Sequence, residues 1–129
     1  MGGTSEFRVD QVKNRLYIKL SGFFRGNDAQ SVMDGLEAAL RDVQPDFDVV
    51  TDLSDFVPGS PGATAALTKG GELVREKGRR YGVRITGGLM TGIMQFQRLL
   101  KGVFDETNTK MAKSVQEADD MLDNWSNES

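Results

Sequence analysis

Apolar side chains alternate with polar ones along two stretches near the N-terminus. Residues 5–10 and 15–21 carry an apolar side chain at every second position, and the polar residues between them supply a turn. A period of two is typical of a strand with one buried face. The pattern therefore predicts an antiparallel hairpin at the start of the chain.

Four later stretches repeat apolar residues at helical spacing, which predicts helices with one apolar face. These stretches are residues 28–43, 61–77, 91–102 and 115–125. Ser60 followed by Pro61 has the order of an N-cap and a first helical residue, and Gly78 ends the helix that they open. Ser114 and Glu117 have the spacing of a capping box before the last helix.

Three apolar stretches between these helices predict further strands. They are residues 47–53, 81–86 and 109–113. The first has apolar side chains on both faces, which is typical of a strand in the middle of a sheet. A hairpin followed by β–α units predicts an α/β fold with a mixed, mostly parallel, five-stranded sheet. We expect a single domain over residues 1–129, ordered from about residue 5 to about residue 125.

Composition removes most kinds of catalytic site. The chain of 129 residues contains neither Cys nor His. It therefore has no disulfide, no thiolate nucleophile and no imidazole to act as a base or to bind a metal. The remaining acids and bases form no spaced pair that would predict general acid–base catalysis. We expect no enzyme activity, no bound metal and no cofactor.

Net charge and hydropathy bear on partners and on location. The formal net charge is −3, which gives no bulk attraction to nucleic acid or to an anionic membrane surface. No run approaches the roughly 20 apolar residues of a membrane span, and the N-terminus lacks the basic and apolar segments of a secretory signal. The sequence predicts a cytoplasmic protein that binds no nucleic acid and does not insert stably into membranes.

The middle of the chain resembles a known regulatory family. Residues 49–54 read Val-Val-Thr-Asp-Leu-Ser, residues 59–62 read Gly-Ser-Pro-Gly, and the helix after them ends Arg-Glu-Lys-Gly at residues 75–78. With the initial hairpin and the Ser-x-x-Glu-Ala start of the last helix, this pattern resembles the STAS domain of anti-sigma-factor antagonists over roughly residues 5–124. It looks closer to the SpoIIAA-like branch, which is related in shape to lipid-transfer domains and lacks the phosphoserine loop.

The resemblance implies a fold and a non-enzymatic role. In this family the strands lie in nearly sequential order, and the helices lie largely on one face of the sheet. The family's loop carries a serine that a partner kinase phosphorylates, and Pro61 occupies that position here. The resemblance implies a regulatory or protein-binding module of undefined pathway without the usual phosphoserine switch. Ser60 and Thr64 are the alternative phosphorylation sites.

The loop between the central strand and the second helix is the first candidate site. Its residues are Gly59, Ser60, Pro61, Gly62 and Thr64. Free backbone N–H groups at a helix start can bind an anion or a phosphate group. The alternative is that Ser60 only caps the helix, which is the commoner role of such a residue.

The second candidate site is the next strand-to-helix corner along the chain. Met90, Ile93, Met94 and Phe96 could line a small apolar pocket there. The alternative is that these side chains fill the core. A pocket predicts a carrier or sensor of a small apolar or lipid-like ligand, whereas a filled core with an exposed patch predicts docking of a protein partner. Either function is compatible with a homo-oligomer.

Charged residues form two further groups, for which we expect structural roles. Asp48, Asp52 and Asp55 could bind a hard cation near the end of the central strand, but turn hydrogen bonds are the commoner use of such residues. Residues 79–84 carry three arginines. These could attract an acidic partner, although solvated surface or protection of a strand edge is the commoner explanation.

Overall fold

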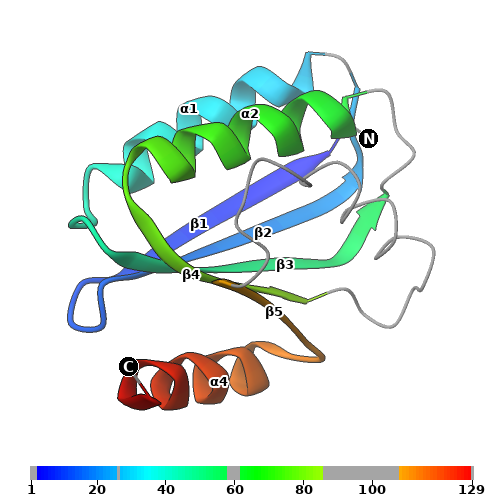
Figure 1. Ribbon diagram of the computed structural model, residues 1–129. Helices are drawn as coiled ribbons and strands as arrows, with labels where there is room; N and C mark the ends of the chain where they lie inside the picture. The colour runs from blue at the N-terminus through cyan, green and yellow to red at the C-terminus, as the bar shows by residue number, and fades with distance from the viewer. Residues whose placement is uncertain (1–2, 26, 58–61, 86–107, 129) are drawn as a thin grey trace.

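An N-terminal hairpin is followed by alternating helices and strands in the computed structural model, which describes residues 3–25, 27–57, 62–85 and 108–128 (Figure 1). The strands are β1 (Thr4–Asp10), β2 (Arg15–Phe23), β3 (Phe47–Val57), β4 (Arg79–Ile85) and β5 (Thr109–Ala112). The described helices are α1 (Asp28–Leu40), α2 (Ala63–Glu76) and α4 (Val115–Glu128). The predicted α/β class is confirmed.

The five strands form one sheet in the order of the chain, β1-β2-β3-β4-β5. β1 and β2 pair antiparallel, whereas β2 with β3, β3 with β4, and β4 with β5 pair parallel. A parallel connection needs a crossover, and α1 and α2 supply the crossovers on either side of β3. The predicted mixed, mostly parallel, five-stranded sheet is therefore confirmed.

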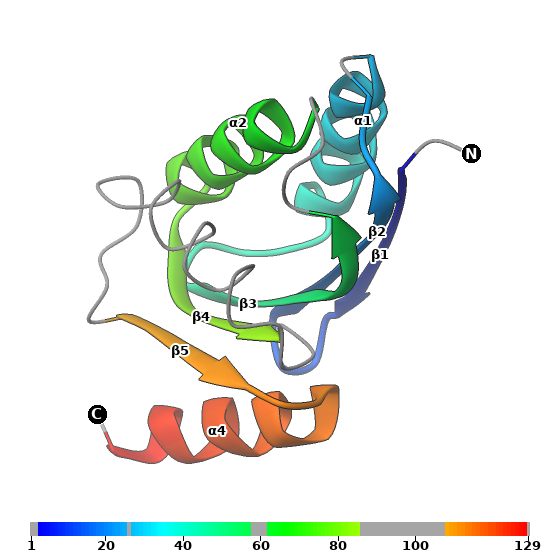
Figure 2. The same ribbon diagram turned by 90° about the vertical axis from the view of Figure 1, so that its right-hand side faces the viewer.

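Helices cover both faces of the sheet. α1 and α2 lie side by side on one face, and α4 lies on the other, against β3, β4 and β5 (Figures 1 and 2). The position of α4 departs from the one-sided arrangement that the family resemblance implies. Within the described part of the chain, no helix combines the length and the apolar character that crossing a bilayer requires.

β3 separates two hydrophobic cores, because its side chains alternate between the faces of the sheet. Phe47 and Val49 belong to the core beneath α1 and α2. Val50 points the other way and belongs to the core that includes Ala118 and Leu122 of α4. The apolar residues on both sides of this strand predicted its central position, and the sheet order confirms it.

Turn and cap residues fix the ends of several elements. The Asn14 side chain donates to the Gln44 carbonyl oxygen at 3.0 Å and accepts from the Gln44 N–H at 2.8 Å. Gly78 follows α2 with φ of 97°, a left-handed conformation that glycine adopts without strain. The Ser114 hydroxyl accepts a hydrogen bond from the Glu117 N–H at 3.1 Å and so caps α4. The stop at Gly78 and the Ser114 cap were both predicted.

The predicted start of the second helix is wrong. α2 begins at Ala63 with Gly62 as its N-cap residue, and not at Pro61 behind a Ser60 cap. The Gly62 N–H is engaged with the carbonyl oxygen of Phe24. The helix therefore begins one residue after the glycine that makes this contact.

Other predicted elements have shifted ends or lie outside the described residues. The helix predicted over residues 28–43 ends at Leu40, and the strand predicted over residues 47–53 continues to Val57. The helix predicted over residues 91–102 lies outside the described part of the chain.

Candidate functional site

Two exposed apolar side chains lie next to each other at the C-terminal ends of β2 and β3. Phe23 is 47% exposed and Val57 is 41% exposed, and the two residues are register partners in the parallel pair. The adjacent residues Phe24 and Phe56 are buried, and their rings meet edge to face with centroids 5.4 Å apart. Phe23 and Val57, the sheet-end patch, are therefore flanked by a packed aromatic pair.

The start of α2 packs against the connection that follows β2. The Gly62 N–H donates to the Phe24 carbonyl oxygen at 2.9 Å, and Gly62 is buried. A Cβ atom at position 62 would overlap the carbonyl oxygen of Arg25, so this position requires glycine. The contact joins the C-terminal end of β2 to the N-terminus of α2 beside the sheet-end patch.

The predicted loop site is described only in part. Gly62 is the N-cap of α2, and Thr64 lies in the first turn of that helix. The other three residues lie outside the described part of the chain: Gly59, Ser60 and Pro61. Anion binding by this loop, and phosphorylation of Ser60 or Thr64, therefore stay predictions.

A small cavity lies between the sheet and the helices α1 and α2. Its volume is about 60 Å³, and apolar side chains such as Leu36, Val49 and Val74 line it. An apolar cavity that holds benzene measures roughly 150 Å³, so this space is too small for a lipid-like ligand. The residues predicted to line a ligand pocket lie outside the described part of the chain; they are Met90, Ile93, Met94 and Phe96.

The acidic residues near the end of β3 make local bonds. Asp52 accepts hydrogen bonds from the backbone N–H and the hydroxyl of Ser54, at 3.0 and 2.5 Å. Asp55 pairs with Lys19 at 3.5 Å. Among the described residues, no group of three or more acidic side chains is arranged to hold a metal ion. The predicted local backbone bond is confirmed for Asp52, although β3 continues past this residue to Val57 and no bend follows it. Asp55 forms an exposed ion pair.

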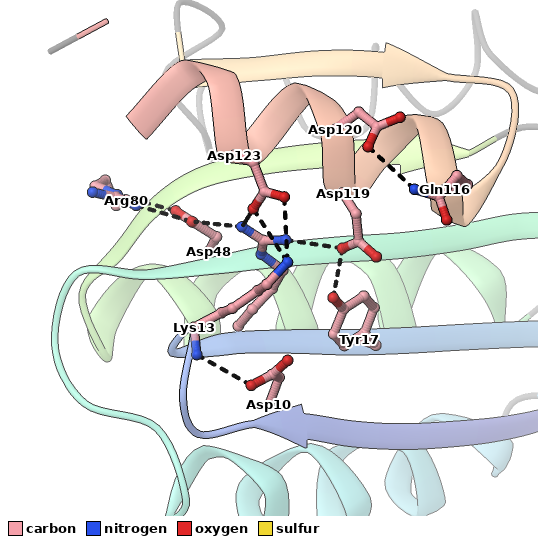
Figure 3. A network of polar contacts seen from close by, with 10 residues as sticks. Asp10, Lys13, Tyr17, Asp48, Arg80, Gln116, Asp119, Asp120 and Asp123 are labelled. Carbon is pink, nitrogen blue, oxygen red and sulfur yellow. Dashed lines mark hydrogen bonds and ion pairs between the residues drawn. The ribbon is translucent and has the colours of Figure 1, made fainter. Parts of the chain in front are cut away.

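A cluster of charged side chains lies between the sheet and α4 (Figure 3). Arg15 of β2 donates to Asp119 at 2.9 Å and to Asp123 at 3.0 Å. Tyr17 donates its hydroxyl proton to Asp119 at 2.5 Å, and Lys13 pairs with Asp123 at 3.3 Å. These contacts attach one side of α4 to β2 and to the hairpin turn. We call this group, together with Asp48 and Arg80, the α4 anchor cluster.

Asp48 completes the cluster from inside the sheet. Its side chain is 1% exposed and accepts two hydrogen bonds from Arg80, at 3.1 and 3.0 Å. The guanidinium of Arg15 lies 4.0 Å from the same carboxylate and is 3% exposed. A buried carboxylate is stable only when cations or hydrogen bonds compensate its lost hydration. The two arginines supply that compensation.

A bulge in β4 brings Arg80 to this carboxylate. Phe47 pairs with Arg79 and Val49 pairs with Gly82, so two residues of β4 lie opposite Asp48 alone. Such an extra residue re-aims the side chains of a strand. Arg80 and Tyr81 consequently contact each other, with the Arg80 guanidinium carbon 4.7 Å from the Tyr81 ring centroid.

The contacts of the α4 anchor cluster shift several pKa values. Burial alone would lower the pKa of Arg15, but its hydrogen bonds to Asp123, Tyr17 and Asp119 raise that pKa overall. The hydrogen bond from Arg15 lowers the pKa of Asp123. Burial and the bond to Asp119 raise the pKa of Tyr17. Tyr17 is therefore a hydrogen-bond donor, and not a base, near neutral pH.

The expectation of a solvated or edge-protecting basic surface over residues 79–84 is wrong. Arg80 pairs with Asp48, Arg79 donates to Thr109 at 3.2 Å, and Arg84 is only 8% exposed. The reason is the position of β4 between β3 and β5, which makes it an interior strand. Arg84 is buried, whereas Arg79 and Arg80 are half-buried and each bonds a neighbouring strand.

Comparison with known proteins assigns no family to the chain. No protein-family model matches it, and no curated protein is significantly similar to it.

Sequence reasoning missed the α4 anchor cluster because its members are far apart in the chain. Arg15 and Asp48 are register partners on neighbouring strands, and Asp119 and Asp123 lie one helical turn apart on α4. The one available signal was a charge at position 48 between the apolar residues Phe47 and Val49 of a strand predicted to be central. A buried charge requires a partner, but the sequence does not say which residue supplies it.

Proposed function

We propose that this chain is a STAS-like, non-enzymatic module that docks a protein partner at the C-terminal end of its sheet. The contact surface is centred on the sheet-end patch, Phe23 and Val57, which lies beside the start of α2. The role of the module is regulatory or protein-binding, and its pathway is undefined.

The exposed sheet-end patch is the observation that carries this proposal. Exposed aromatic and aliphatic side chains that lie together mark protein interaction sites more often than isolated ones do. Phe23 and Val57 are held by strand pairing and by the neighbouring Phe24–Phe56 contact. A partner would therefore lose little binding free energy to ordering the backbone at these two positions.

The family resemblance supports the same face of the molecule. The Asp-Leu-Ser segment at residues 52–54 and the glycine at position 62 belong to the STAS-like pattern. They flank the end of β3 and the start of α2, next to the sheet-end patch. The sequential strand order agrees with the resemblance, while the placement of α4 on the second face does not.

Carriage of a small apolar ligand is the second candidate function. The cavity beneath α1 and α2 is the observation in its favour. Its volume of about 60 Å³ is well below that of a cavity able to hold an aromatic ring. We therefore place docking ahead of carriage.

Capture of binding proteins by the purified chain tests the docking function. The Phe23→Asp variant should lose a protein that the wild type retains, because a central interface aromatic contributes about 2 kcal/mol or more, roughly a thirtyfold change in Kd. Val115→Asp is the matched control, since Val115 is 37% exposed but lies at the start of α4. Equal capture by all three proteins would contradict docking at the sheet-end patch.

Native and denaturing mass spectrometry distinguish the two candidate functions. Extra mass that is lost on denaturation would identify a noncovalent ligand and favour the carrier. A phosphate-sized increment that survives denaturation would direct mapping to Ser60 and Thr64. A bare mass in both measurements supports the docking module over the carrier.

A further inference from the structure

β1 is an edge strand in the described part of the sheet. Its only strand partner among the described residues is β2, and Figure 2 shows it at the rim of the sheet beneath α1. An edge strand exposes a row of backbone N–H and C=O groups that can pair with another strand. With seven residues, β1 is long enough to form a full ladder.

Two opposite charges of β1 lie on either side of its central residue. Glu6 and Arg8 are exposed on the sheet face that α4 occupies in part, where Glu6 is the register partner of Lys19 and Arg8 lies 3.8 Å from the ring centroid of Tyr17. Phe7, between them, points to the other face and packs against the core under α1. A charge of each sign thus flanks one central aromatic residue.

Self-pairing over the full length of this strand has one register, the one centred on Phe7. A register centred on Val9 would place Arg8 opposite Asp10, but it would pair only residues 8–10 of the strand. A two-fold axis perpendicular to the sheet keeps the faces of both copies aligned, so antiparallel registers differ by steps of two residues. The register centred on Phe7 places Glu6 opposite Arg8 of the second copy, twice. A shift in one direction places Glu6 opposite Glu6, and a shift in the other places Arg8 opposite Arg8. Like charges directly opposite destabilise a strand pair, whereas opposite charges stabilise it.

The surface beside the β1 edge has room for the second copy. A groove of about 550 Å³ lies between α1 and the edge strand, and Phe7, Val9, Gly35 and Ala38 are among its walls. The two-fold axis places the second α1 on the same face, opposite the first. The exposed small side chain of Ala38 allows close approach of that helix, whereas Gly35 packs against Phe7 of its own chain. The groove would therefore be covered in the pair.

We propose that two copies of this chain associate through β1, forming an antiparallel strand pair centred on Phe7 that extends the sheet across both molecules. The reciprocal Glu6–Arg8 contacts set the register, and the paired grooves bury apolar surface of Phe7 and Val9. This association uses the opposite edge of the sheet from β5. It is independent of the docking function proposed for the sheet-end patch.

Sedimentation of single-charge variants tests this pairing. The wild type should show a concentration-dependent shift from 14.2 kDa toward twice that mass. Arg8→Glu places Glu opposite Glu on both sides of the axis, and we expect dimerisation at least tenfold weaker. Lys69→Glu is the matched control, since Lys69 is exposed on α2 and the charge change is identical. Circular dichroism establishes that each variant is folded.

A mixture of two variants gives the most specific test of the Glu6–Arg8 contacts. Glu6→Arg alone places Arg opposite Arg and should also be monomeric, but a mixture of Glu6→Arg with Arg8→Glu restores two opposite-charge pairs in a heterodimer. We expect dimerisation to return only in the mixture. A wild type that stays at 14.2 kDa at every concentration, or a dimer that Arg8→Glu leaves intact, would overturn the proposal.

Discussion

Asp48 is a carboxylate inside the sheet with a guanidinium group on either side. Arg80 donates two hydrogen bonds to it, and Arg15 lies 4.0 Å away. Arg15 also keeps a buried Nε that has no hydrogen-bond partner among the described atoms. The hydration that these groups lose on folding is costly, and their mutual contacts offset that cost only while all members are present. The site is therefore sensitive to the loss of one charge.

Asp48→Asn should destabilise the protein by more than about 1 kcal/mol, because two guanidinium groups then face a neutral amide. The loss should stay below the roughly 3–5 kcal/mol of an uncompensated buried charge, since Arg15 keeps its bonds to Asp119 and Asp123. Chemical denaturation of the variant and the wild type measures this loss. Asp55→Asn is the control, since Asp55 is 65% exposed and its pair with Lys19 should contribute less than about 1 kcal/mol. If both variants lose the same free energy of unfolding, the burial of Asp48 does not make its ion pairs more important for stability than the exposed pair of Asp55.

At the scale of elements, α4 is held to the sheet by two different kinds of contact. Leu122 and Ala118 are fully buried, and the Trp125 ring stacks on Tyr81 with centroids 4.2 Å apart. Asp119 and Asp123 reach the arginine and tyrosine of β2 on the other side of the helix. The polar half of this attachment depends on pH, whereas the apolar half does not.

The attachment of α4 should weaken in acid. The Arg15 hydrogen bond lowers the pKa of Asp123 in the folded protein. A carboxyl group with a lowered folded-state pKa stabilises the fold above its unfolded-state pKa, and this contribution is lost as the pH falls through the folded-state pKa. We expect the free energy of unfolding to decrease from about pH 5 downward. Asp123→Asn should make this decrease smaller, as urea denaturation across that pH range can measure.

Asp120→Asn is the control for the acid experiment. Asp120 is exposed on the same helix, and its carboxylate accepts a hydrogen bond only from Gln116 among the contacts described for it. This variant should keep the pH dependence of the wild type. If Asp123→Asn and Asp120→Asn have the same profile as the wild type, the Arg15 contact does not contribute to stability in a pH-dependent way.

Local patterns predicted the elements, but not the contacts between distant ones. Alternation and helical spacing gave the hairpin, the central strand and the last helix, because these signals depend on neighbours in the chain. The Ser114 cap was predicted for the same reason. The contact of Arg80 with Asp48 depends on a bulge in the pairing of β3 with β4. The start of α2 at Ala63 depends on the hydrogen bond from the Gly62 N–H to the Phe24 carbonyl oxygen, which follows β2. Such long-range contacts leave no periodic signal in the sequence.

At the scale of the whole molecule, one strand connects the two cores. Val49 and Val50 are adjacent in β3, yet one packs beneath α1 and α2 and the other beneath α4. If β3 unfolds, both cores lose buried side chains at the same time. The two layers of helices should therefore unfold together.

Urea denaturation followed by two probes tests this coupling. Trp125 is the only tryptophan and reports on the α4 side, while far-ultraviolet circular dichroism reports on all helices and strands. We expect the two transitions to coincide, as in a two-state domain. A tryptophan transition at lower urea concentration would show that α4 and its core unfold as a separate unit.

The order of the strands in the sheet has a consequence for synthesis on the ribosome. Each described strand pairs with its neighbours in the chain, so every new strand of this sheet meets a partner that has already been made. β5 and α4 are completed last. Until α4 emerges, Val83 and Ile85 of β4 present apolar surface to water on the side that this helix later covers. The nascent protein would therefore be most prone to aggregation just before its last helix leaves the exit tunnel.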